Sequence, residues 1–143
     1  MSATVRQMLA GRGEAISVAP STTVFQALQR MAEHNIGALL VMDGDRLAGI
    51  FSERDYARKV ALRGLNSKDT PVGDLMTGKV ITVGPSWTAE QCMALMTEHH
   101  IRHLPVVEGE RVLGVVSIGD AVKSVVDEQH FVIGQLTNYI THS

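Results

Sequence analysis

Two short segments of the chain combine a serine, an aspartate and the predicted start of a helix. They are Gly49-Ile-Phe-Ser52-Glu-Arg-Asp55 and Gly114-Val-Val-Ser117-Ile-Gly-Asp120. A helix N-terminus has free backbone N–H groups and a positive dipole end, both of which favour a phosphate. The hydroxyl of Ser52 or Ser117 could add a donor, and an aspartate carboxylate has two acceptor oxygens that suit a ribose cis-diol. Because Ser-x-x-Asp is also close to a capping box, and most such signals merely start helices, the motif alone is more typical of helix initiation.

Cationic side chains near the two segments are distributed unequally. Arg54 and Arg58 lie four residues apart, on one face of the predicted helix, where they could reach a phosphate or stay solvated. In the second segment Gly119 replaces Arg54, but Arg102 and His103 lie shortly before it. These two side chains could form charge-assisted hydrogen bonds to an anion, or could simply add polarity to the surface.

No other group of residues predicts catalysis or metal binding. His99, His100 and His103 lack a fourth ligand and a general-base motif such as HExxH, so we expect no metal site. Cys92 is expected to be a small buried residue, and Trp87 to be a packing residue. Because nucleophile-elbow, P-loop and Cys/His patterns are absent from the sequence, we predict a binding protein and not an enzyme.

Composition limits the class of protein further. The 143 residues are 45% apolar and carry a formal net charge of -2, so nothing in the charge favours nucleic acid or an anionic membrane. The single cysteine excludes an internal disulfide and suits the cytoplasm. No signal-peptide core and no long apolar run occurs, so membrane insertion is not expected.

The chain contains an internal repeat. Residues 16–60 align with residues 81–125 without a gap, and eighteen of the forty-five paired positions are identical. Each copy is preceded by a short lead-in, Val5–Leu9 for the first and Val72–Met76 for the second. The sequence therefore has the form of a duplication, and each copy should fold in the same way.

Local patterns predict the order βαββα in each copy. Thr23-x-x-Gln26 and Thr88-x-x-Gln91 are capping boxes that open helices with one apolar face. Turn residues at 43–45 and 108–110 predict hairpins. The predicted strands are Ala15–Val18, Ala38–Met42 and Leu47–Phe51 in the first copy, and Val80–Val83, Leu104–Val107 and Val112–Val116 in the second.

These elements predict an α+β fold in which two βαββα repeats pack sheet to sheet about a pseudo-twofold axis. One such unit would bury too little apolar surface to be comfortably stable alone. We expect the first unit with its lead-in and linker at residues 1–66, the second at 67–127, and a helical tail at 128–143. The spacing of Phe131, Ile133, Leu136 and Ile140 suits an amphipathic helix that packs on the repeats or on a second chain.

In these segments the sequence resembles the CBS-domain family, as a tandem pair or Bateman module. The resemblance covers nearly the whole chain and rests on the two GxxSxxD segments, the strand entries at 36–41 and 101–106, and Leu75-Met76-Thr77. It implies two clefts between the repeats that bind AMP, ADP or ATP, sometimes NAD or S-adenosylmethionine. It also implies homodimers, in which two modules form a flat disc.

The resemblance assigns roles to individual residues. Asp55 and Asp120 would hold the ribose hydroxyls, with Ser52 and Ser117 beside them. Phosphate would be bound by Arg102 and His103 in the Asp120 cleft, and by Arg54, Arg58 or Lys79 in the Asp55 cleft, where Gly37-Ala38 replaces the first pair. Adenine would lie against residues of the lead-ins and strands, namely Gly13, Ala15, Ile16, Thr77, Val80, Ile81 and Pro105.

The leading hypothesis is therefore a regulatory module that senses an adenine nucleotide, AMP, ATP or NAD, through a ligand-dependent change in conformation. Such a module would act on a separate regulated protein. The alternative is a dimerising interaction module without a physiological ligand, in which both aspartates serve only as helix caps.

Overall fold

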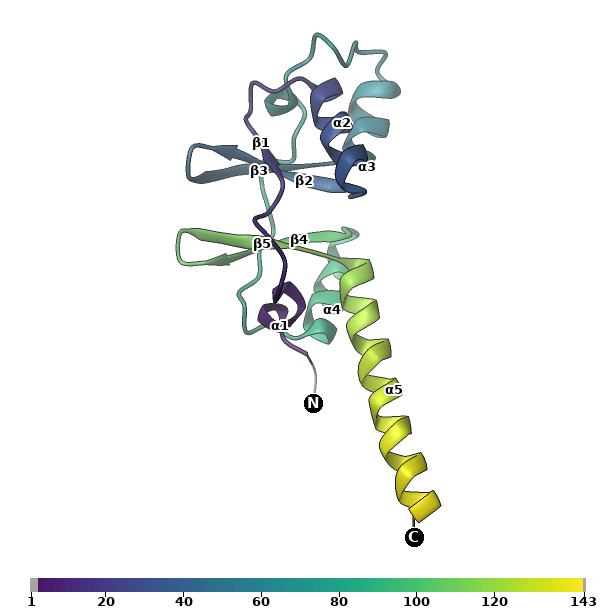
Figure 1. Ribbon diagram of the computed structural model, residues 1–143. Helices are drawn as coiled ribbons and strands as arrows, with labels where there is room; N and C mark the ends of the chain where they lie inside the picture. The colour runs from purple at the N-terminus through teal and green to yellow at the C-terminus, as the bar shows by residue number, and fades with distance from the viewer. Residues whose placement is uncertain (1–2, 143) are drawn as a thin grey trace.

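The computed structural model describes the backbone of residues 3–142 and the side chains of residues 3–137. Each repeat supplies one hairpin with helices on its outer side, and the two hairpins lie face to face (Figure 1). The first repeat contains β1 (Ser17–Val18), α2 (Val24–His34), β2 (Ala38–Asp43), β3 (Arg46–Ser52) and α3 (Glu53–Asp55), followed by a π-helical segment, Tyr56–Ala61. The second contains α4 (Ala89–His99), β4 (His103–Glu108), β5 (Arg111–Ser117) and α5 (Ile118–His142). The helix α1 (Val5–Leu9) precedes the first repeat, and a 3-10 turn, Val72–Asp74, precedes the second.

Both predicted capping boxes are present and start α2 and α4. The hydroxyls of Thr23 and Thr88 accept hydrogen bonds from the backbone N–H groups of Gln26 and Gln91. The glutamine side chains accept hydrogen bonds in return from the threonine N–H groups, which satisfies two otherwise unpaired donors at each helix start. The duplicated sequence thus fixes the same helix in each repeat.

The hairpins also repeat closely. β2 pairs antiparallel with β3, and β4 with β5, with Ala38 opposite Ser52 and His103 opposite Ser117. Both of the serines that were predicted to border a ligand therefore lie at the ends of hairpin strands, where the chain enters a helix. The predicted fold class is confirmed, with two separate sheets that do not close into a barrel.

The predicted first strand of the first repeat is shorter than expected, and the predicted first strand of the second repeat does not form. β1 covers only Ser17–Val18, and Val83 forms a single parallel bridge to Val106. Proline explains the difference between the repeats. The Leu40 N–H donates to the Ile16 carbonyl, but Pro105, which is equivalent to Leu40, has no N–H to donate to the Ile81 carbonyl.

Each lead-in packs on the other repeat. Val5 of α1 is fully buried in the core formed by α4, β4 and β5, and its N–H donates to the Trp87 carbonyl. Val72 is buried in the core of the first repeat, and its N–H donates to the Thr22 carbonyl. The crossed lead-ins link the two repeats, and Figure 1 shows α1 beside the hairpin of the second repeat. The division of the chain at residues 66 and 127 stays a prediction.

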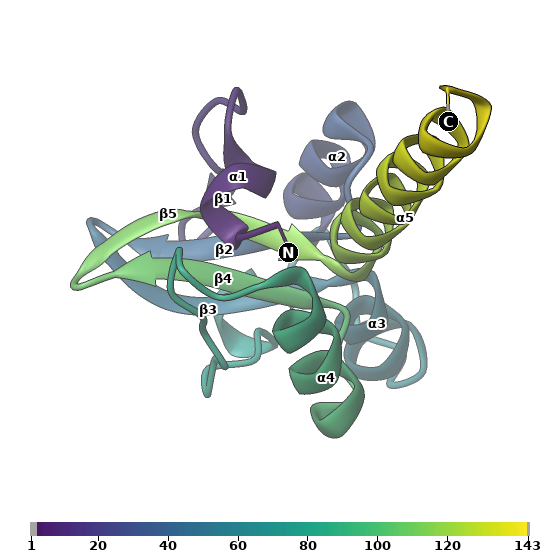
Figure 2. The ribbon, with the colours of Figure 1, turned by 90° about the horizontal axis from the view of Figure 1, so that it is seen from below.

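The tail is not a separate element. Residues 128–142 continue α5, which starts at Ile118 and extends away from the repeats (Figures 1 and 2). Phe131, Ile133 and Leu136 are 58–66% exposed, so these residues do not pack on the repeats, and the alternative that they pack on a second chain stays a prediction. The side chain of Ile140 lies outside the described residues. The first turns of α5 pack with α1 and α4 around the core of the second repeat through Ala121 and Val125, and the rest of the helix extends beyond that core.

Candidate functional site

A cavity of about 570 Å³ lies between the repeats, beside the start of α5. Its size is in the range of small-molecule pockets. Residues of the loop after α1, the start of β2 and the end of β5 line it. Among the residues predicted to bind a ligand, it brings together Gly13, Ala15, Ile16, His103, Ser117 and Asp120.

Asp120 is held at the cavity by its own helix start. Its backbone N–H donates to Ser117 Oγ, and its carboxylate accepts a hydrogen bond of 2.8 Å from the Ser117 N–H. The strand β5 therefore sets the position of the carboxylate, because Ser117 is its last residue. The capping interpretation is confirmed, and the capped carboxylate lines the cavity, whereas its role in ribose binding stays a prediction.

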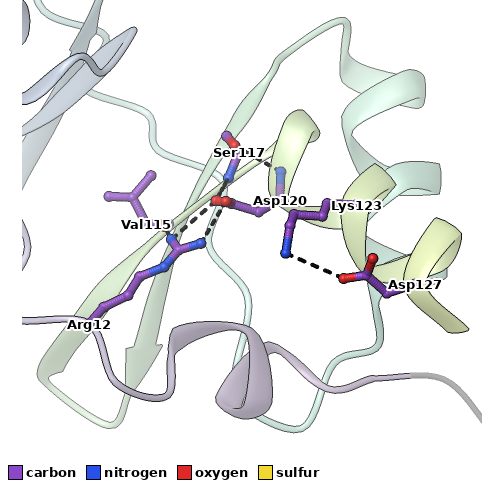
Figure 3. Close-up of polar contacts among 6 residues, drawn as sticks. All are labelled: Arg12, Val115, Ser117, Asp120, Lys123 and Asp127. Carbon is purple, nitrogen blue, oxygen red and sulfur yellow. Dashed lines mark hydrogen bonds and ion pairs between the residues drawn. The ribbon is translucent and has the colours of Figure 1, made fainter.

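Arg12 also contacts this carboxylate, and the sequence did not predict that contact. One guanidinium nitrogen lies 2.6 Å from Asp120 Oδ1, and the other lies 3.2 Å from Oδ2 (Figure 3). The second nitrogen also donates to the Val115 carbonyl at 3.4 Å. The available signal was alignment of the lead-ins, in which Gly11-Arg12 corresponds to Gly78-Lys79.

The electrostatics of this cleft favour an anionic carboxylate beside a neutral imidazole. Burial alone would raise the pKa of Asp120, but hydrogen bonds from Arg12 and Ser117 and the guanidinium charge outweigh it, so the pKa is lowered. Burial lowers the pKa of His103, opposed by the negative charges of Asp120 and Glu53 and assisted by Arg102. The imidazole lies over Gly37, where an added Cβ would come within 3.5 Å of the ring. His103 can therefore accept a proton when a ligand brings negative charge.

The equivalent carboxylate in the first repeat is already satisfied by the protein. Asp55 Oδ1 lies 3.1 Å from the Lys59 ammonium and accepts a hydrogen bond from the Thr77 hydroxyl at 3.2 Å. Oδ2 accepts hydrogen bonds from the Ser52 N–H and hydroxyl. The Asp55 side chain is 12% exposed, against 24% for Asp120. The two carboxylates thus share a motif but differ in access.

The length of the lead-in loop explains the difference in access. Six residues separate Leu9 from Ile16, but only four separate Met76 from Ile81. After the shorter loop, Thr77 forms a two-way backbone bridge with Ile50 of β3, which draws its hydroxyl onto Asp55. The longer loop leaves room for the cavity at Asp120.

The remaining predicted residues lie elsewhere. The Arg54 guanidinium donates to the His100 carbonyl at 2.6 Å and so joins the two repeats. Arg58, Lys79 and Arg102 are exposed, and Pro105 is buried at the centre of β4. Val80 and Ile81 are half-buried in the second lead-in loop. None of these seven residues lines the cavity at Asp120, and their roles in binding stay predictions.

A second cavity, of about 470 Å³, adjoins the first. It shares Asn35, Ile36 and Gly37 with the first cavity and is also lined by Glu53 and Tyr56. Within residues 3–137, no group of three or more His, Cys, Asp or Glu side chains could hold a metal ion. In the described part of the chain, no helix is both long and apolar enough to cross a membrane.

Fold and cleft together define a tandem-repeat module with a cavity between its two repeats. Residues 9–62 and 72–137 each match the CBS domain, so the chain belongs to the CBS-domain family. It is 46% identical over 123 residues to the CBS domain-containing protein CBSX3, mitochondrial, of Arabidopsis thaliana, which covers 82% of this chain and 60% of that relative. The chain thus matches somewhat more than half the length of that protein.

Solved structures agree with this assignment. A protein with CBS domains from Burkholderia ambifaria is 51% identical, with a TM-score of 0.83, covering 89% of this chain and 96% of the other. A CBS domain protein from Pyrobaculum aerophilum, complexed with AMP, is 26% identical with a TM-score of 0.73, covering 82% and 89% of the two chains. Tandem CBS domains form a regulatory module, and the relatives include one that holds an adenine nucleotide.

Proposed function

We propose that the chain is a non-catalytic sensor that binds an adenine nucleotide such as AMP in the Asp120 cleft. The observation that carries this proposal is the Asp120 carboxylate, which faces a cavity between the two repeats. Its oxygens suit the two hydroxyls of a ribose, and His103 on the same cavity can receive a phosphate. The AMP complex of the Pyrobaculum relative supports the choice of ligand.

The cleft also offers a route from binding to regulation. It is lined by the loop after α1, by β2 of the first repeat and by β5 of the second. A ligand that contacts all three fixes the relative position of the repeats and biases the start of α5, which carries Asp120. The exposed length of α5 would then present that change to a regulated protein.

The test is calorimetric titration of AMP into the wild type and Asp120→Asn. The expected result is that binding is weakened by about ten- to several-hundred-fold, because charge-assisted hydrogen bonds are worth about 1.5–3 kcal/mol each. Asp127→Asn is the matched control, since Asp127 pairs with Lys123 on the exposed face of α5, away from the cavity (Figure 3). Equal AMP affinity in all three proteins would refute the ribose contact.

A dimerising module without a ligand is the second candidate, and one observation favours it. The exposed apolar side chains of α5, Val126, Phe131, Val132, Ile133 and Leu136, are an unusual surface for a single copy of the chain. A stable dimer in sedimentation that binds neither AMP, ATP, NAD nor S-adenosylmethionine would support this candidate over the sensor.

A further inference from the structure

The guanidinium of Arg12 occupies the carboxylate oxygens that the proposed function assigns to ribose. Its two nitrogens lie 2.6 and 3.2 Å from the two Asp120 oxygens (Figure 3). Oδ2 also accepts the Ser117 N–H at 2.8 Å. Three of the roughly four acceptor sites of the carboxylate are therefore engaged, so Asp120 cannot accept both hydroxyls of a ribose unless Arg12 moves away.

The loop that carries Arg12 is built to allow such a movement. The side chain is 44% exposed, and the hydrogen bonds that the structure shows for it run to Asp120 and the Val115 carbonyl. Gly11 has a φ of +81°, a conformation that side chains rarely adopt, and a Cβ added at Gly13 would meet no atom within 4 Å. Glycine on both sides lets the backbone at Arg12 change conformation at low cost.

A displaced guanidinium needs a new anionic partner. Arg12 and His103 line the same cavity, so a phosphate that approaches His103 enters a space that the guanidinium also reaches. Arginine binds phosphate through two parallel hydrogen bonds, as it binds a carboxylate. A nucleotide can thus replace the ion pair that its ribose breaks, whereas a neutral nucleoside cannot.

We propose that Arg12 makes phosphate a requirement for binding, an inference that rests on the proposed function. Its guanidinium blocks Asp120 and transfers to the ligand phosphate when the ribose hydroxyls arrive. Arg12 therefore selects nucleotides over nucleosides by an exchange of partners. The first repeat has no such exchange, because Lys59 is held by the Leu75 carbonyl and Thr77 as well as by Asp55.

The test compares adenosine with AMP by calorimetry in the wild type and Arg12→Gln. Adenosine should bind the variant about 2- to 5-fold more tightly, because a partly exposed ion pair no longer competes. AMP should lose its guanidinium contact, so the preference for AMP over adenosine should fall by about tenfold or more. Arg12→Lys, which keeps the charge but lacks the planar fork, should retain an intermediate preference.

Arg6→Gln is the matched control, because Arg6 pairs with the exposed Glu108 on the outer surface and does not line the cavity. Its AMP and adenosine affinities should equal those of the wild type. An unchanged preference for AMP in Arg12→Gln would overturn the exchange of partners while leaving the sensor intact. If the wild type bound AMP but Asp120→Asn bound it equally well, the proposed ribose contact would fail instead. A wild type that bound neither compound would overturn both.

Discussion

Gly49 and Gly114 occupy equivalent positions in β3 and β5 but face very different surroundings, which allows a matched test of the crossed lead-ins. A Cβ at Gly49 would lie 2.6 Å from the Met76 sulfur and 2.7 Å from the Thr77 carbonyl oxygen. A Cβ at Gly114 would lie 3.1 Å from a terminal carbon of Leu9. The clash at Gly49 includes a backbone atom, the Thr77 carbonyl oxygen, whereas the contact at Gly114 involves only the flexible end of the Leu9 side chain.

The expected magnitudes follow from these distances. Ordinary contact begins at 3.4 Å, so Gly49→Ala must push the second lead-in away from β3 by well over half an ångström. This strains the backbone bridge, in which Ile50 and Thr77 exchange hydrogen bonds of 3.1 and 2.9 Å. Overpacking of about 1–3 kcal/mol and weakened hydrogen bonds of about 1 kcal/mol each give a loss of about 3 kcal/mol. Gly114→Ala should cost about 1 kcal/mol or less, because Leu9 can change rotamer.

Urea denaturation and differential scanning calorimetry of both variants provide the measurement. At this chain length about 3 kcal/mol corresponds to a fall in Tm of roughly 10 °C, against about 3 °C or less for Gly114→Ala. Wild-type protein at the same concentration is the reference. If Gly49→Ala were as stable as Gly114→Ala, the second lead-in would not be packed on β3 as described, and the account of the closed Asp55 cleft would fail with it.

Two further predictions concern the carboxylates and the imidazole. Asp55→Asn should destabilise the fold by about 1–2 kcal/mol, because the partly exposed Lys59 loses a charged partner but keeps the Leu75 carbonyl and Thr77. AMP affinity should stay within about twofold of wild type, with one ligand per chain. Abolished AMP binding in this variant would contradict the assignment of a single open cleft. AMP affinity should rise as the pH falls below neutrality toward the lowered pKa of His103, since a bound phosphate raises that pKa and binding then takes up a proton. The rise should be absent for adenosine and for His103→Gln, and a rise of equal size in His103→Gln would show that another group titrates.

The sequence alone determined the features that depend on neighbouring residues. The duplication, both capping boxes and both hairpins follow from local patterns that need no distant partner, as at Thr23 with Gln26. The Ser-x-x-Asp motif likewise set the position of Asp120 at the end of β5, because the cap is local. Even the absence of the predicted first strand in the second repeat has a local cause in Pro105, although its effect appears only once the partner strand is in place.

Tertiary structure decided which of the two equivalent carboxylates is open. Asp55 and Asp120 are indistinguishable by motif, but the crossed lead-ins bring Thr77 onto the first and Arg12, 108 positions away in sequence, onto the second. Loop lengths that differ by two residues change these contacts, because a short loop continues the pairing with β3 and a longer one leaves a cavity. Contacts between charged side chains so far apart depend on the path of the whole chain, so no local pattern specifies them.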